Sequence, residues 1–114
     1  KYFDKSVNSK KIIQHIGSGL EIIPKINKKF QIAFIDADKE NYSKYFDLVF
    51  DKIDLGGIII ADNVLWSGKV IDDEMDNETR ELNLFNKKIT RDSRVENILL
   101  SVRDGLMICR KIEN

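Results

Sequence analysis

The chain has 114 residues, 42% hydrophobic and 33% charged, and its 19 basic and 19 acidic residues leave a formal net charge of zero. This length holds one modest domain, and the balanced charge gives no support to a polyanionic partner beyond local lysine clusters. No apolar run approaches the roughly 20 residues that cross a bilayer, and the single cysteine, Cys109, excludes a disulfide within the chain, so we expect a cytoplasmic protein with no membrane partner.

The first part of the chain predicts a short strand followed by a helix. Residues 12–16 are apolar around His15, the only histidine, which we expect to be packed rather than catalytic. The turn Gly17-Ser18-Gly19 leads into residues 20–26, where apolar positions share a helical face. Pro24 is the only proline and is tolerated in the first turn of such a helix.

The central part predicts two parallel strands joined by a helix. Residues 30–35 and 58–61 are short apolar runs typical of buried strands. Between them, apolar residues recur every three or four positions, as on one face of a helix: Tyr42, Tyr45, Phe46, Val49, Phe50 and Ile53. Gly56-Gly57 is expected to end this helix with a left-handed turn. A strand, a helix and a second strand in this order form a crossover with parallel strands.

The last part predicts a loop, a covering helix and a hairpin. Residues 66–79 form a charged loop, and residues 78–89 form a helix with Leu82, Phe85 and Ile89 on one face. Strands at 95–102 and 106–112 then pair through a hairpin turn. We therefore expect an α/β fold with a mostly parallel sheet that ends in a C-terminal antiparallel hairpin.

Polar side chains follow both central strands at their carboxyl ends. Asp36 comes directly after the first strand, and Asp62 and Asn63 follow the second. Adjacent parallel strands end at the same edge of a sheet, where open α/β folds bind ligands. Two carboxylates and an amide oxygen suit a hard divalent cation such as Mg²⁺ or Ca²⁺. Asp36 and Asp38 alone also fit turn residues, so the metal hypothesis depends on both strand ends.

The motifs FIDADKENY (34–42) and GGIIIADNVLWSGKV (56–70) resemble the cation-dependent class I O-methyltransferases, which include caffeoyl-coenzyme A and catechol O-methyltransferases. The resemblance continues through FNKKITRDSRVENILLSVRDGLMICRK (85–111). It implies a Rossmann-like methyltransferase sheet, S-adenosylmethionine as cofactor, and a divalent cation held by Asp36, Asp62 and Asn63. A homodimer is also expected.

The same resemblance implies cofactor-binding residues. Asp36, Asp38 and Tyr45 match positions that contact S-adenosylmethionine. Gly19 belongs to a looser match with the turn near the adenine, and a plain strand-to-helix turn is the alternative there.

The resemblance further implies a catalytic group and an acceptor pocket. Lys39 matches a lysine proposed as general base, a role that requires the neutral amine. The alternative is a lysine that only pairs with a carboxylate. Trp66 and Ser67 match positions that line the acceptor pocket, although Trp66 also fits a loop anchor.

Two family features are missing from the chain: a glycine-rich turn after a first strand and an acidic residue at the end of a second. We therefore expect residues 1–114 to be the C-terminal portion of a single methyltransferase domain, with its N-terminal part missing. Such a piece is expected to be inactive alone, and the strand at 12–16 would lack a neighbour.

The expected function is methyl transfer from S-adenosylmethionine to a hydroxyl group, dependent on a divalent metal. Chelation favours substrates with neighbouring oxygens, so we expect a phenolic small molecule of the catechol or caffeoyl type. Two alternatives stay open: 5-hydroxyuridine in tRNA as the acceptor, and a non-catalytic fragment or binding module.

Overall fold

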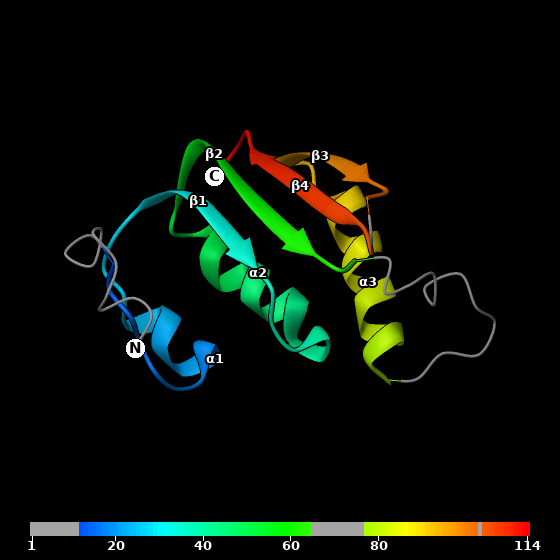
Figure 1. The fold of residues 1–114 in the computed structure, drawn as a ribbon. Helices are drawn as coiled ribbons and strands as arrows, with labels where there is room; N and C mark the ends of the chain where they lie inside the picture. The colour runs from blue at the N-terminus through cyan, green and yellow to red at the C-terminus, as the bar shows by residue number, and fades with distance from the viewer. Residues whose placement is uncertain (1–11, 65–76, 103) are drawn as a thin grey trace.

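The computed structural model describes residues 12–64, 77–102 and 104–114. They form a four-stranded mixed sheet with its helices on one side (Figure 1). The strands are β1 (Phe30–Ile35), β2 (Ile53–Asp62), β3 (Val95–Leu100) and β4 (Leu106–Lys111). Their order in the sheet is β1-β2-β4-β3, with β1 parallel to β2 and β4 antiparallel to both neighbours. The α/β fold and the C-terminal antiparallel hairpin are confirmed.

The parallel pair β1 and β2 is confirmed, but β2 begins earlier than the sequence indicated. It starts at Ile53 rather than Ile58. The pairing with β1 is irregular here, because Phe30 pairs with Ile53 and Ile32 pairs with Ile58, and residues 54–57 lie between these two partners. Gly56 has the expected left-handed backbone, with φ of 84°. It lies inside this irregular strand, however, and does not end the helix as predicted. Glycine serves bulges and helix ends equally well, because both can require positive φ.

Helix α2 (Tyr42–Phe50) follows the 3-10 turn η4 (Lys39–Asn41) and covers the sheet. The predicted apolar face is buried except for Val49, which is partly buried, and Phe46 is completely enclosed. Ile53 was wrongly assigned to this helix. It is buried in β2 instead, where it pairs with Phe30, so the chain must turn after Phe50.

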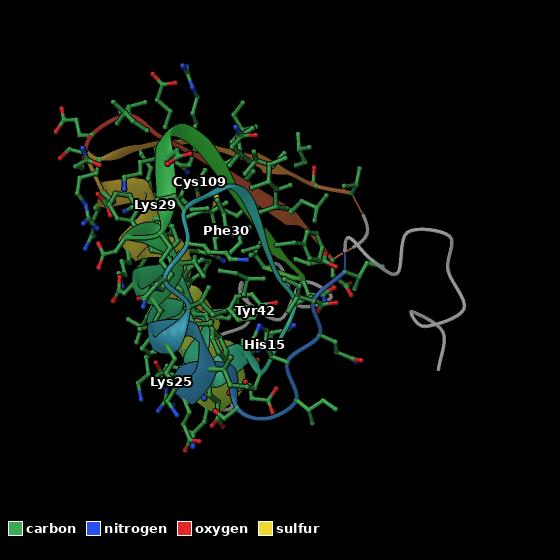
Figure 2. All side chains as sticks on the ribbon, turned by 90° about the vertical axis from the view of Figure 1, so that its left-hand side faces the viewer. His15, Lys25, Lys29, Phe30, Tyr42 and Cys109 are labelled. Atoms are coloured by element: carbon green, nitrogen blue, oxygen red, sulfur yellow. The ribbon has the colours of Figure 1, made fainter. Side chains whose placement is uncertain are left out.

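Helix α3 (Asn77–Arg91) packs beside α2 on the same face of the sheet (Figure 1). The predicted side chains Leu82, Phe85 and Ile89 are fully buried. The Phe85 and Tyr42 rings pack in a T-shaped arrangement at a centroid distance of 5.6 Å. The core therefore lies between the sheet and these two helices. Cys109 of β4 belongs to this core (Figure 2).

The predicted strand at residues 12–16 is wrong. These residues have no regular secondary structure, and His15 is exposed rather than packed. A strand needs a neighbour to satisfy its backbone hydrogen bonds, and none of the described strands pairs with this segment. The predicted helix at 20–26 is shorter, as α1 (Gly19–Ile22) followed by the 3-10 turn η3 (Ile23–Lys25). Pro24 lies in η3, where its missing N–H prevents an α-helical hydrogen bond.

The face of the sheet opposite the helices is apolar and open. Ile32 and Phe34 of β1 are 63% and 58% exposed, and Ile98 of β3 is 63% exposed.

In the part of the chain that the structure describes, no helix combines the length and apolarity needed to span a membrane.

Candidate functional site

The carboxyl ends of β1 and β2 meet at one edge of the sheet (Figure 1). Asp36 follows β1, Asp62 is the last residue of β2, and Asn63 follows it. The Asn63 side-chain amide donates to Oδ1 of Asp36 at 3.3 Å. The Asn63 backbone N–H donates to Oδ1 of Asp62 at 2.8 Å. The structure therefore brings together the three residues predicted as metal ligands.

Asn63 adopts a backbone conformation that is uncommon for residues other than glycine. Its φ is 60°, in the left-handed region where asparagine is enriched. Unusual backbone of this kind is often found at functional sites. In this backbone conformation, the Asn63 side-chain amide contacts Asp36.

The donor set at this edge fits a hard divalent cation, because it offers two carboxylates and an amide that can present oxygen. Among residues 12–64, 77–102 and 104–114, no three or more His, Cys, Asp or Glu side chains are grouped to hold a metal ion. A cation at this edge would therefore need the Asn63 amide, with oxygens from water or substrate completing the shell.

Lys39 lies beside the candidate metal ligands in a buried position, only 6% exposed. Its Nζ donates to the Tyr42 hydroxyl at 2.8 Å and to the Ala37 carbonyl at 3.1 Å. The same atom is 3.6 Å from Oδ1 of Asp36. The predicted catalytic lysine therefore has a defined place in the protein and does not extend into solvent.

Tyr42 connects Lys39 to both strand ends, a role that sequence reasoning missed. Its hydroxyl donates to the Asp62 carbonyl at 2.7 Å, and the Ile35 carbonyl lies at 3.4 Å. Burial, reinforced by the nearby Asp36 charge, raises the pKa of the Tyr42 hydroxyl above its ordinary value. The hydroxyl therefore keeps its proton. The sequence contains one signal for this role. Tyr42, three residues after Lys39, brings a hydroxyl group to a helix face that was predicted to be apolar.

The predicted cofactor residues gather around an open pocket of about 360 Å³ beside β1. Gly19, Asp36 and Tyr45 are among its lining residues. Gly19 has no space for a side chain, because a Cβ there would lie 2.9 Å from Cε1 of Tyr45. The Tyr45 hydroxyl donates to Oδ1 of Asp38 at 2.6 Å, which links the fourth predicted residue to the pocket.

Asp38 and Tyr45 form a polar pair, of which Tyr45 lines this pocket. The hydrogen bond from Tyr45, with a second from Asn41, holds the pKa of the Asp38 carboxyl below its usual value. The same bond to Asp38, together with burial, raises the pKa of Tyr45 to about 12. At neutral pH the pair is therefore a carboxylate and a protonated phenol.

The predicted acceptor residues Trp66 and Ser67 lie outside the described residues, as do residues 66–76 of the predicted loop. The predicted loop is wrong at residues 77–79, which belong to α3.

The family model for O-methyltransferases matches residues 1–112. The chain belongs to the O-methyltransferase family. A caffeoyl-CoA O-methyltransferase from Mesembryanthemum crystallinum is 42% identical over 90 residues, which are 73% of this chain and 35% of that protein. Tricin synthase 2 from Oryza sativa subsp. japonica is 40% identical over 91 residues, which are 74% of this chain and 31% of that protein.

Solved O-methyltransferases share the fold as well. The O-methyltransferase from Bacillus cereus, solved with SAH, matches with a TM-score of 0.72 and 30% identity. The match covers 81% of this chain and 45% of the Bacillus chain. The chain thus spans about a third of the length of the two plant relatives and just under half of this solved structure.

Proposed function

We propose that the parent protein, meaning the protein that contains this chain, is an S-adenosylmethionine-dependent O-methyltransferase that requires a divalent cation. The observation that carries the proposal is the contact between Asn63 and Asp36, directly beside the pocket that Asp36 and Tyr45 line. Asp36 would then belong both to the cofactor pocket and to the cation site at the strand edge. Family membership supports the reaction class.

The cofactor would occupy the pocket lined by Gly19, Asp36 and Tyr45, where it would supply the methyl group. The missing side chain of Gly19 lets the backbone lie close to the Tyr45 ring at this pocket. The carboxylate of Asp38, held by Tyr45, would accept hydrogen bonds from polar groups of the ligand. The SAH found in the Bacillus cereus relative supports a ligand of this class.

Asp36, Asp62 and Asn63 would hold Mg²⁺ or Ca²⁺ at the strand edge. When bound there, such a cation would supply positive charge that favours loss of the proton from an acceptor hydroxyl. The left-handed backbone of Asn63 and the hydrogen bonds between these residues would keep the ligands in place before substrate arrives.

Lys39 would take the proton of the acceptor hydroxyl or direct its transfer. Its contacts with Tyr42, Ala37 and Asp36 fix Nζ next to the cation region. Because the side chain is buried, water would compete poorly for the same position.

The proposed acceptor is a small phenol with neighbouring oxygens, of the catechol or caffeoyl type, because two adjacent oxygens can chelate one cation. The caffeoyl-CoA O-methyltransferase from Mesembryanthemum crystallinum supports the caffeoyl type through its name. The test measures methyl transfer by the parent protein to catechol, to a caffeoyl thioester and to tRNA that contains 5-hydroxyuridine. Methyl transfer to the phenols supports the proposed acceptor, whereas transfer to tRNA alone would show that tRNA is the acceptor instead. No transfer to any of them, with no binding of SAH by calorimetry, leaves a non-catalytic role.

A further inference from the structure

We infer that Tyr42 is a positioning residue for Lys39: its hydroxyl group holds Nζ in place at the edge where β1 and β2 end. The catalytic consequence of this inference rests on the proposed function, but the positioning itself does not. It follows from the hydrogen bonds of one buried hydroxyl and from the packing of its ring.

The hydroxyl of Tyr42 has one proton, and the geometry commits that proton to a backbone carbonyl. The closest acceptor is the Asp62 carbonyl at 2.7 Å, with the Ile35 carbonyl farther away at 3.4 Å. With the proton used in this way, the oxygen presents its lone pairs to Lys39, whose Nζ donates at 2.8 Å. The hydroxyl therefore links Lys39 Nζ to Asp62, the last residue of β2, by one hydrogen bond to each.

The ring of Tyr42 is held so firmly that the hydroxyl has little freedom to move. Tyr42 is fully buried, and its ring meets Phe85 of α3 edge-on, with a centroid distance of 5.6 Å and an interplanar angle of 84°. Lys39 Nζ lies 4.7 Å from the same ring centroid. Edge-to-face packing of this kind favours one ring orientation.

This arrangement gives Lys39 a place that its own flexible side chain could not ensure. A lysine side chain loses substantial rotamer entropy when it is fixed, and the buried tyrosine provides a partner that is already ordered. Removing the hydroxyl while keeping the ring should therefore loosen Nζ, which keeps the Ala37 carbonyl and Asp36 as partners, without disturbing the core. Tyr42→Phe makes this change.

The first test measures the accessibility of Lys39 and needs no enzyme activity. The parent protein and its Tyr42→Phe variant are treated briefly with acetic anhydride, and acetylation of each lysine is measured by peptide mass spectrometry. Loss of one hydrogen bond should raise labelling of Lys39 roughly two- to tenfold. Lys44, an exposed lysine on α2, is the internal control and should not change. Unchanged labelling of Lys39 overturns the inference.

The second test asks whether Tyr42 acts on the reaction through Lys39. Tyr42→Phe should lower kcat roughly 10- to 100-fold with little change in KM for the cofactor, the scale expected when a buried donor loses its hydrogen-bond partner. In a Lys39→Ala background the same substitution should change kcat by less than about twofold. An equal loss in both backgrounds overturns the inference, because it would show an effect independent of Lys39.

A matched control is Tyr45→Phe, which removes the same atom one helical turn further along α2. Because the Tyr45 hydroxyl donates a hydrogen bond to Asp38, this variant should raise KM for the cofactor and leave labelling of Lys39 unchanged.

If Tyr42→Phe does not fold, Phe85→Leu loosens the Tyr42 ring while keeping its hydroxyl. It should then give a smaller increase in Lys39 labelling, and no increase overturns the inference. If the unsubstituted protein shows no transfer, the proposed function fails, but the labelling experiment still decides the role of Tyr42.

Discussion

The side-chain amide of Asn63 lies 3.3 Å from the carboxylate of Asp36, although 27 positions separate these residues in the sequence. The contact exists because β1 and β2 are adjacent and parallel and therefore end at the same edge. It joins two short motifs that are individually ordinary. The proposed cation site, and with it the proposed chemistry, depends on this contact.

Asn63→Gly should weaken binding of Mg²⁺ or Mn²⁺ by the parent protein by roughly tenfold or more, the scale of losses when a metal site is disturbed. Glycine is the informative replacement because it accepts the φ of 60° that Asn63 adopts, so only the amide is lost. The measurement is calorimetry, or paramagnetic resonance with Mn²⁺. Asp47→Asn is the matched control, since Asp47 is an exposed carboxylate on α2 that pairs with Lys88. Equal affinity in Asn63→Gly and the unsubstituted protein would remove Asn63 from the site.

Lys39→Ala in the parent protein should lower kcat roughly 10²- to 10⁴-fold, the usual contribution of general acid–base catalysis. Lys39→Arg should not restore the rate, because an arginine in a protein does not release its proton. Since Lys39 is buried, SAH affinity and thermal stability of the arginine variant must first show that the larger side chain fits. A well-folded arginine variant that recovers most of the rate would show that Lys39 supplies positive charge rather than a base.

The Tyr45 hydrogen bond predicts a specific pH effect at Asp38. Because the pKa of Asp38 is lowered in the folded protein, the bond stabilises the fold above the pKa of the unfolded chain. This stabilisation is lost as the pH falls through the folded pKa. Tyr45→Phe should therefore raise the Asp38 pKa, measured by NMR titration of its carboxyl carbon, and should destabilise the protein less in acid than at neutral pH. Asn41→Ala should raise the same pKa by a smaller amount, because Tyr45 is the larger cause. An Asp38 pKa that is unchanged in Tyr45→Phe would refute this account.

Gly57→Ala should destabilise the fold by roughly 1 to 3 kcal/mol, the usual cost of overpacking. A Cβ at Gly57 would lie 2.8 Å from the Asp54 carbonyl and 2.9 Å from the Gln31 carbonyl, neither of which can move freely. The measurement is urea unfolding. The neighbour Gly56 tests a different cause, since no atom lies within 4 Å of a Cβ there but its φ is 84°. Gly56→Asn should accordingly be tolerated better than Gly56→Ala. A neutral Gly57→Ala would show that this part of β2 is not as tightly packed as described.

The sequence was most informative where a local pattern and the fold agree. The bounds of β1 follow from a six-residue apolar run that ends at Asp36, and the covering helices follow from apolar residues spaced by three and four, such as Leu82 and Phe85. Asp36, Asp62 and Asn63 could be grouped in advance because parallel strands end at one edge.

The sequence failed where the outcome depends on distant partners. Residues 12–16 have strand composition, but no described strand pairs with them. Gly56 has the left-handed conformation of a helix end yet lies inside β2, because the pairing of Ile53 with Phe30 starts the strand earlier. The role of Tyr42 was hidden because its hydroxyl binds backbone carbonyls that only the folded sheet brings together.

The most direct test of the central claim is the rate of methyl transfer from S-adenosylmethionine to catechol by the parent protein, measured with and without a chelator. A cation held by Asp36, Asp62 and Asn63 predicts that EDTA abolishes transfer and that added Mg²⁺ restores it. It also predicts that SAH still binds in EDTA, because the pocket beside Tyr45 remains intact. Transfer that continues at an unchanged rate in excess EDTA would contradict the account.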